Sequence, residues 1–123
     1  MKNLIDIASV APIPVWQSVR ARRIEGEQLT MAVVELAPNA PVPEHRHANE
    51  QLGIVIQGQV QMRVGDEERT LGPGGTWRVL ANEPHSIIRT GPDGAIVIDV
   101  FTPIRSDWDA LGTEEVQSPL WPR

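Results

Sequence analysis

The chain of 123 residues has a net charge of −5 and 41% hydrophobic residues, which is ordinary for one domain with its own core. The absence of cysteine excludes disulfides and thiol catalysis, and the acidic balance argues against a general nucleic-acid partner. No apolar run reaches membrane-spanning length, so we expect a single cytoplasmic domain over residues 1–123 with no membrane partner.

Short runs of aliphatic and β-branched residues alternate with proline and glycine, which is typical of strands. We predict strands near Val15–Ile24, Leu29–Leu36, Leu52–Ile56, Gln59–Val64, Glu67–Leu71, Thr76–Leu80, His85–Arg89 and Ala95–Phe101. Turn signals such as Gly72–Gly75 and Gly91–Gly94 separate them. This spacing indicates an all-β antiparallel barrel or sandwich, followed by a tail over about residues 106–123 with a short turn near Ser106–Leu111.

Arg20, Arg22 and Arg23, the main basic cluster, lie in the first predicted strand. We interpret this cluster as a solvated strand face.

Two of the predicted strands are apolar on both faces. Ile96 and Ile98 alternate with Val97, and Leu52 alternates with Val55 in the same way. An antiparallel sheet with one wet face alternates more cleanly than this. We therefore expect another sheet layer or a second subunit over the outer face, and we favour a homodimer to which the tail over residues 108–121 contributes.

The three histidines and one glutamine are candidates for a metal site. His45, His47 and Gln51 share the same parity, and residues two apart on a strand lie about 6.6 Å apart on one face. Imidazoles and an amide oxygen form a plausible ligand set, although a pair of exposed histidines would give the same pattern. His85 follows a Pro-Gly-Gly turn, and Trp77, on the strand leading to it, is the tryptophan we expect to contact a ligand.

A second group of candidates lies near the end of the last predicted strand. Asp99 interrupts an apolar run and shares its parity with Phe101, so both should face the interior. A buried aspartate can act as a general acid and base, with burial raising its pKa and a nearby cation lowering it. Arg105 could hold a carboxylate through two hydrogen bonds, or could pair with Asp107 or Asp109 instead. Asp99 as a loop cap and Phe101 as core filler stay open as alternatives.

These residues resemble the two motifs of the cupin family. The first motif, over about residues 39–58, reads Asn39, His45, His47, Gln51 and Gly58. The second, over about residues 72–89, has a Pro-Gly turn followed by His85. The resemblance implies a double-stranded β-helix, which is a jelly-roll barrel. It also implies one divalent metal ion held by His45, His47, Gln51 and His85.

The chain departs from the general cupin pattern at four positions. Asn39 and Asn82 stand where glycines are usual, and asparagine tolerates left-handed backbone. Arg89 replaces an asparagine, and Gln51 replaces the ligand glutamate. A ligand set without charge would leave the ion its full positive charge and favour an anionic ligand. Zinc, nickel, iron, cobalt and manganese all suit such a set.

The segment from Asp99 to Arg105 reads D-x-F-x-x-x-R. Together with Gln51, it is similar to the KdgF-type cupins of pectin and alginate breakdown. That resemblance implies an isomerase that converts 4,5-unsaturated monouronates to linear keto-uronates. It implies Asp99, Phe101 and Arg105 as the catalytic residues, and a small anionic sugar acid as substrate.

Two other functions remain open at this stage, because a cupin barrel hosts many chemistries. One is a mononuclear metal dioxygenase, which oxygen uptake would reveal. The other is a cupin that senses a small molecule without turning it over.

Overall fold

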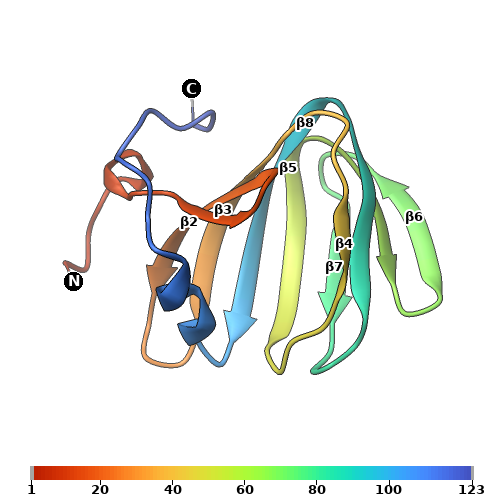
Figure 1. Cartoon of the computed structure of the whole chain (residues 1–123), viewed down its shortest axis with the longest axis horizontal. Helices are drawn as coiled ribbons and strands as arrows, with labels where there is room; N and C mark the ends of the chain where they lie inside the picture. The colour runs from red at the N-terminus through yellow and green to blue at the C-terminus, as the bar shows by residue number, and fades with distance from the viewer. Residues whose placement is uncertain (1, 123) are drawn as a thin grey trace.

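Two long strands, β5 (Glu50–Val64) and β8 (His85–Thr102), pair along their whole length at the centre of the fold (Figure 1). The structure is a computed structural model, and it describes residues 2–122. The other strands flank them: β1 (Ile13–Trp16), β2 (Val19–Glu25), β3 (Thr30–Leu36), β4 (Val42–His45), β6 (Glu67–Leu71) and β7 (Thr76–Val79). All of the strand pairs are antiparallel.

The flanking strands divide between the two halves of the central pair. β3 joins the C-terminal half of β8, with β2 and β1 beyond it, and β7 joins the N-terminal half of β5. β4 joins the start of β8, and β6 joins the end of β5. The side chains between these halves form one cluster of buried residues, which includes Val34, Val55, Val60 and Val97. The all-β jelly-roll expected from the sequence is confirmed.

The long strands bend where two glycines meet. Gly58 and Gly94 have φ angles of 80° and 73°, and a Cβ on Gly58 would lie 2.1 Å from the Gly94 carbonyl oxygen. The prediction divided each long strand in two and placed a turn at Gly91–Gly94, which was wrong. Glycine here lets the strand bend and its partner approach closely, and the strand continues through it.

Two other boundaries differ from the prediction. The first predicted strand is a hairpin, because a turn at residues 17–18 separates β1 from β2 without a glycine or proline to mark it. The short strand β4 was missed, since Pro43 within it reads as a breaker. Asn39 and Asn82 adopt left-handed backbone with φ angles of 51° and 62°, as expected for residues in glycine positions.

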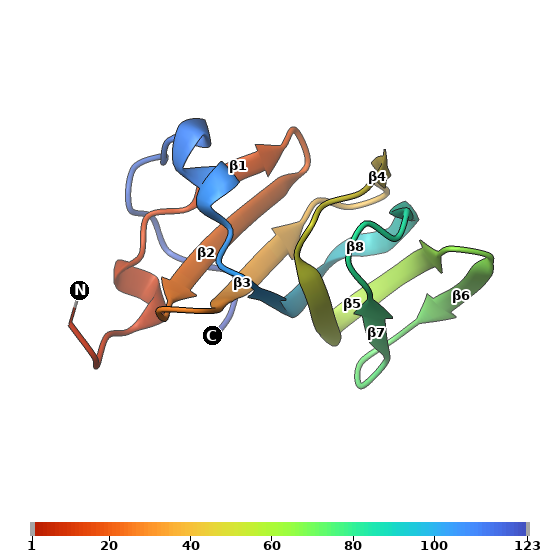
Figure 2. The ribbon, with the colours of Figure 1, turned by 90° about the horizontal axis from the view of Figure 1, so that it is seen from below.

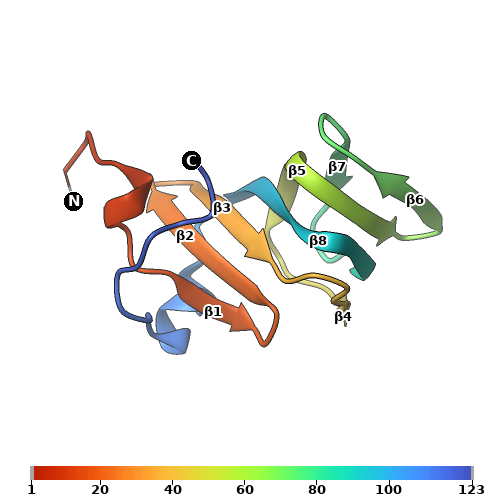
Figure 3. The same ribbon diagram turned by 90° about the horizontal axis from the view of Figure 1, so that it is seen from above.

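The C-terminal segment lies against the first two strands, as Figures 2 and 3 show. It contains the 3₁₀ helix η2 (Ser106–Leu111); the other such helix, η1 (Ile7–Ser9), is near the N-terminus. Neither helix, and no other helix of the described chain, is long and apolar enough to cross a membrane.

The arginine cluster binds this C-terminal segment. Its assignment to a solvated face was therefore wrong for Arg22 and Arg23, whereas Arg20 is exposed as expected. Arg22 is only 1% exposed and donates to Glu35 Oε2 at 2.7 Å and to the Gln117 carbonyl at 3.2 Å. Arg20 pairs with Glu114. Arg22 can be buried because Glu35 on β3 and the tail together supply its acceptors, which no local pattern announces.

The outer face of the central strands stays uncovered. Leu52 is 54% exposed, Met31 39% and Ile54 36%. They are neighbours across strands, because Met31 and Leu52 both pair with Val100. Within the described chain, no second sheet layer covers these side chains, so that alternative for the outer face is wrong.

We expect Glu35→Ala to destabilise the fold by about 3 kcal/mol, because it leaves the buried Arg22 guanidinium without its counter-charge. The matched control is Glu114→Ala, which removes the partner of the exposed Arg20 and should cost less than about 1 kcal/mol. Urea unfolding measures both variants. Equal losses would show that the Arg22 pair contributes no more than a surface pair.

Candidate metal centre and pocket

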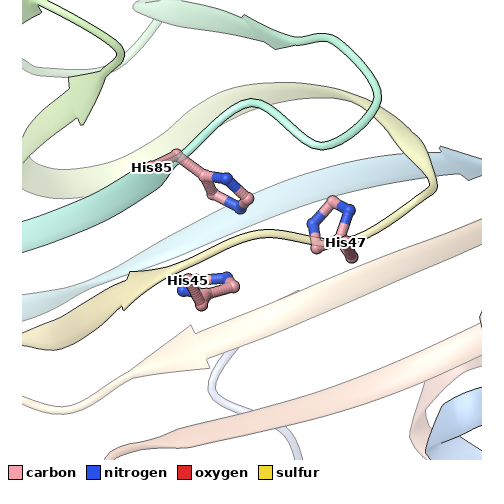
Figure 4. A group of neighbouring side chains, drawn as sticks. All are labelled: His45, His47 and His85. Atoms are coloured by element: carbon pink, nitrogen blue, oxygen red, sulfur yellow. The ribbon is translucent and has the colours of Figure 1, made fainter.

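The three histidines come together at one end of the barrel (Figure 4). His45 ends β4 and pairs with His85 at the start of β8, while His47 lies in the loop after β4. Their candidate ligand atoms lie within 4.8 Å of one another. From the sequence we expected His45 and His47 on one face of a single strand. This prediction was wrong, because β4 ends at His45. The rings converge through the loop and through pairing with β8.

Each imidazole is oriented by a backbone carbonyl. Nδ1 donates to the carbonyl oxygen of Pro43 in His45 at 2.7 Å, of Asn49 in His47 at 2.9 Å, and of Glu83 in His85 at 2.9 Å. A carbonyl can only accept, so Nδ1 carries a hydrogen, and in the neutral ring Nε2 is then the atom with the lone pair. Second-sphere bonds of this kind are how proteins present histidine to a metal.

The ring nitrogens that remain lack partners of the right kind. Nε2 of His85 is buried and has no hydrogen-bond partner among the described residues. Nε2 of His47 faces Gln51 Oε1 at 3.1 Å, and with the hydrogen on Nδ1 both atoms present lone pairs. Burial is the largest cause that lowers the pKa of His85, to about 4, and it also lowers the pKa of His47. These neutral, inward-facing donors fit a divalent metal ion such as zinc, nickel, iron, cobalt or manganese.

Gln51 connects the histidines to Asp99. It lies on β5 with its side chain buried, and its Nε2 donates to Asp99 Oδ1 at 2.9 Å. This bond turns the amide so that Oε1 faces His47. The amide oxygen therefore stands beside the histidine donors, where a fourth ligand would lie.

Asp99 is buried at the same end of the pocket. Its Oδ1 also accepts from Trp77 Nε1 at 2.9 Å, and no described residue donates to Oδ2. Burial raises the pKa of Asp99 to about 6, while the hydrogen bonds from Gln51 and Trp77 and the charge of Arg105 lower it. The sequence left open whether burial or nearby positive charge has the larger effect on this pKa. When only the groups of the protein itself are considered, burial has the larger effect.

Trp77 holds Asp99 and also lines the cavity, and its expected contact with a ligand stays a prediction. It is 7% exposed and pairs across the sheet with Gly53. A Cβ on Gly53 would lie 2.1 Å from the indole, so glycine is needed for the ring to lie flat on β5. No local pattern indicates this pairing.

Phe101 and Arg105 form the neighbouring wall. Phe101 is buried, with its ring 5.8 Å from that of His47 and 5.3 Å from that of Trp108. The Arg105 guanidinium lies 4.6 Å from the Phe101 ring and 4.5 Å from the Trp108 ring. The expected parity of Asp99 and Phe101 holds, since both side chains face inward.

The guanidinium of Arg105 is engaged by Asp107. Nε donates to Oδ1 at 3.0 Å and Nη2 donates to Oδ2 at 2.9 Å, so the ion pair is bidentate. The hydrogen bond from Arg105 is the largest cause that lowers the pKa of Asp107. Asp109, the other acid considered from the sequence, pairs with Arg23.

Sequence reasoning missed Asn49. This buried residue donates through Nδ2 to the carbonyl oxygens of Pro103 and Ile104, at 2.6 and 3.2 Å. It joins the loop that carries His47 to the segment that carries Arg105. An asparagine two residues after H-x-H has no spacing signal that would have singled it out.

These side chains line one cavity of about 230 Å³. His45, Gln51, His85, Asp99, Phe101 and Arg105 supply its functional wall, and apolar residues such as Val34 and Val97 supply the rest. The volume is below the ~300–1,000 Å³ typical of sites for drug-sized ligands. The cavity therefore suits a small molecule.

The fold and the histidine cluster define the class of this protein. A cupin domain model matches residues 32–101, and the chain belongs to the cupin family. It is 29% identical over 83 residues to the pectin degradation protein KdgF of Dickeya dadantii, covering 67% of this chain and 74% of that protein.

Solved structures agree on the fold. The structure of KdgF from Halomonas sp. has a TM-score of 0.77 at 24% identity and covers 87% of this chain and 98% of that one. An RmlC-like cupin from Shewanella frigidimarina has a TM-score of 0.79 at 19% identity, with 88% and 96% covered. This chain is thus a cupin that is similar in sequence to one KdgF protein and shares its fold with the solved structure of another.

We expect Asp99→Asn to stabilise the metal-free protein at neutral pH. Because the folded pKa of Asp99 is raised to about 6, the folded state binds more protons than the unfolded state between about pH 4 and pH 6. The stability from Asp99 is present at low pH and is lost as the pH rises through this window, whereas asparagine stays neutral. The variant should exceed the wild type by on the order of 2 kcal/mol at pH 7 and match it near pH 4.

Urea unfolding with a chelator, from about pH 4 to pH 7, measures the difference. His85 titrates in the opposite sense, with a lowered pKa that makes stability rise with pH, but it is common to both proteins. The control is Asp93→Asn at an exposed position, which should stay within about 0.5 kcal/mol of the wild type. A gap between Asp99→Asn and wild type that is constant with pH would contradict the assignment.

Proposed function

We propose that this protein is a metal-dependent isomerase that converts 4,5-unsaturated monouronates to linear keto-uronates. The observation that carries the proposal is the placement of a buried Asp99 and Arg105 in the cavity that His45 and His85 of the histidine cluster line. The similarity to a pectin degradation protein supports this substrate class. Alginate is a second source of such sugars, and the absence of cysteine is in keeping with cytoplasmic work.

The metal would be held by His45, His47, His85 and Oε1 of Gln51. When bound, a divalent ion supplies a Lewis acid that stabilises negative charge on a substrate oxygen. All four ligands are neutral, so the ion would keep its double positive charge.

Arg105 binds the uronate carboxylate in this proposal. Its guanidinium presents two parallel donors, and the rings of Phe101 and Trp108 fix its plane. Anchoring the carboxylate places the adjacent C4=C5 bond and ring oxygen toward the histidines and Asp99. Orientation of this kind is a large part of catalysis for a unimolecular rearrangement.

Asp99 moves the proton. It accepts the proton of the anomeric hydroxyl as the C1–ring-oxygen bond breaks, and C1 becomes an aldehyde while C5 carries an enolate oxygen. It then delivers the proton to C4, and C5 becomes a ketone, so the product is an isomer with no atom gained or lost. A pKa of about 6 suits both halves of the transfer near neutral pH. Oδ2 is the oxygen available for it, because both donors bind Oδ1.

We expect metal-loaded protein to accelerate the loss of ultraviolet absorbance of the conjugated C4=C5 bond of an unsaturated monouronate. Metal-stripped protein and buffer give the background, because such sugars also open slowly unaided. Asp99→Asn should lose at least about 100-fold in kcat and keep its metal, as measured by elemental analysis. Exposed Glu50→Gln, next to Gln51 on the opposite face of β5, is the matched control and should keep activity.

Normal activity in Asp99→Asn would remove Asp99 from the mechanism. No acceleration with any of the five metals would reject the proposed reaction. Oxygen uptake, or binding without turnover, would then separate a dioxygenase from a sensing cupin.

The exposed apolar face of β3, β8 and β5 supports a homodimer. Leu52, Ile54 and Met31 form a contiguous patch on neighbouring strands, and patches of this kind mark interfaces. A second copy would cover the face that the chain itself leaves open.

We expect light scattering to report a dimer for the wild type and a monomer for Leu52→Glu, because a charge at the centre of an apolar interface is left unpaired. Ile88→Glu, at a 40% exposed position on the N-terminal half of β8, is the control and should stay dimeric. A monomeric wild type would reject the dimer.

A further inference from the structure

The Asp107 carboxylate already occupies the two donors of Arg105 that the carboxylate of a ligand would use. We propose that Asp107 is a resident counter-anion, which the carboxylate of a bound ligand displaces from Arg105, and that Asp107 thereby lowers the affinity of the pocket for acids while leaving that for neutral sugars unchanged. This inference rests on the proposed role of Arg105 as the carboxylate-binding residue.

The arginine is the fixed partner of this ion pair. Its backbone N–H donates to Thr30 Oγ1 at 3.0 Å, and its carbonyl oxygen accepts from Arg23 Nη1 at 3.0 Å. Its side chain is 10% exposed and packs against the rings of Phe101 and Trp108. The guanidinium therefore has little freedom to turn toward a different partner.

The aspartate is the movable partner. The Asp107 side chain is 60% exposed and lies in the short helix η2 at the wall of the cavity. Its carboxylate can rotate into water, where its charge is well solvated, without opening the core. Displacement therefore requires a single side-chain rotation.

The geometry selects the class of competitor. Asp107 uses Nε and Nη2 together, and Nη1 has no acceptor among residues 2–122. A ligand that offers one planar carboxylate reproduces both bonds. A neutral hydroxyl offers neither the charge nor the paired acceptors, so it leaves Asp107 in place.

The Asp107 carboxylate also lowers the affinity of an acidic ligand for Arg105. A bound acid gains its own pair with Arg105 only after the existing pair is broken, so its affinity is reduced by the strength of that pair. Exposed ion pairs are weak, and bidentate geometry places this one at the upper end of their range. Removing the Asp107 charge should therefore tighten the binding of a carboxylate by roughly 3- to 10-fold.

The experiment compares Asp107→Asn with Asp109→Asn in the full-length, metal-loaded protein. Both variants remove one negative charge from η2, and both side chains are similarly exposed, at 60% and 65%. Asp109 pairs with Arg23, so it does not compete for Arg105. The probes are galacturonate, a saturated acid that cannot undergo the proposed reaction, and galactose as its neutral counterpart, both measured by calorimetry.

We expect galacturonate to bind roughly 3- to 10-fold more tightly to Asp107→Asn than to wild type, with Asp109→Asn unchanged and galactose binding the same to all three. Equal tightening in both variants would show a general charge effect and overturn the proposal. Galacturonate binding to Asp107→Asn that is absent, unchanged or weaker would also overturn it. Because the probe does not react, these outcomes are independent of whether the protein turns over an unsaturated uronate.

Discussion

The shared amide of Gln51 is the interaction on which the site depends. Its Nε2 donates to Asp99 and its Oε1 faces His47, so a single side chain sets the orientation of both. A glutamate here would place a second carboxylate about 2.9 Å from Asp99, and two like charges at that distance cannot both stay ionised. The buried Asp99 therefore explains why this cupin has glutamine at the position where the general motif has glutamate.

The wall beside the histidines, which Phe101 and Arg105 form, depends on contacts distant in sequence. The cluster Arg20, Arg22 and Arg23 on β2 binds the C-terminal segment, and Arg23 holds the carbonyl of Arg105 directly. Asn49 ties the same segment to the histidine loop. The position of Arg105 is thus determined by a buried polar network, in which each group needs its partner to offset the loss of water. The tail is consequently part of the pocket and contributes more than a covering for the barrel.

The sequence was sufficient for the features that follow from local pattern. Alternation on β5 placed Gln51 inward and Glu50 outward, and the strand β6 was predicted with its observed bounds. Prediction from the sequence failed where one residue type is compatible with two different backbone structures. Gly94 signals a turn but here lets β8 bend, and Pro43 signals a break but lies within β4. The acceptors of Arg22 lie in β3 and in the tail, so its burial becomes visible only in three dimensions.

The arrangement of charge gives a consistent account of why the pocket would take an anion. The histidines and Gln51 contribute no negative charge to the ligand set, and the two carboxylates nearby are each bound by other side chains. Asp99 lies behind the amide of Gln51, and Asp107 lies on Arg105 at the rim. Negative charge on Asp99 polarises the amide and makes Oε1 a better donor to a cation, without adding charge to the ligand set. A bound divalent ion would thus keep its positive charge at the centre of the pocket, although the chain carries a net charge of −5.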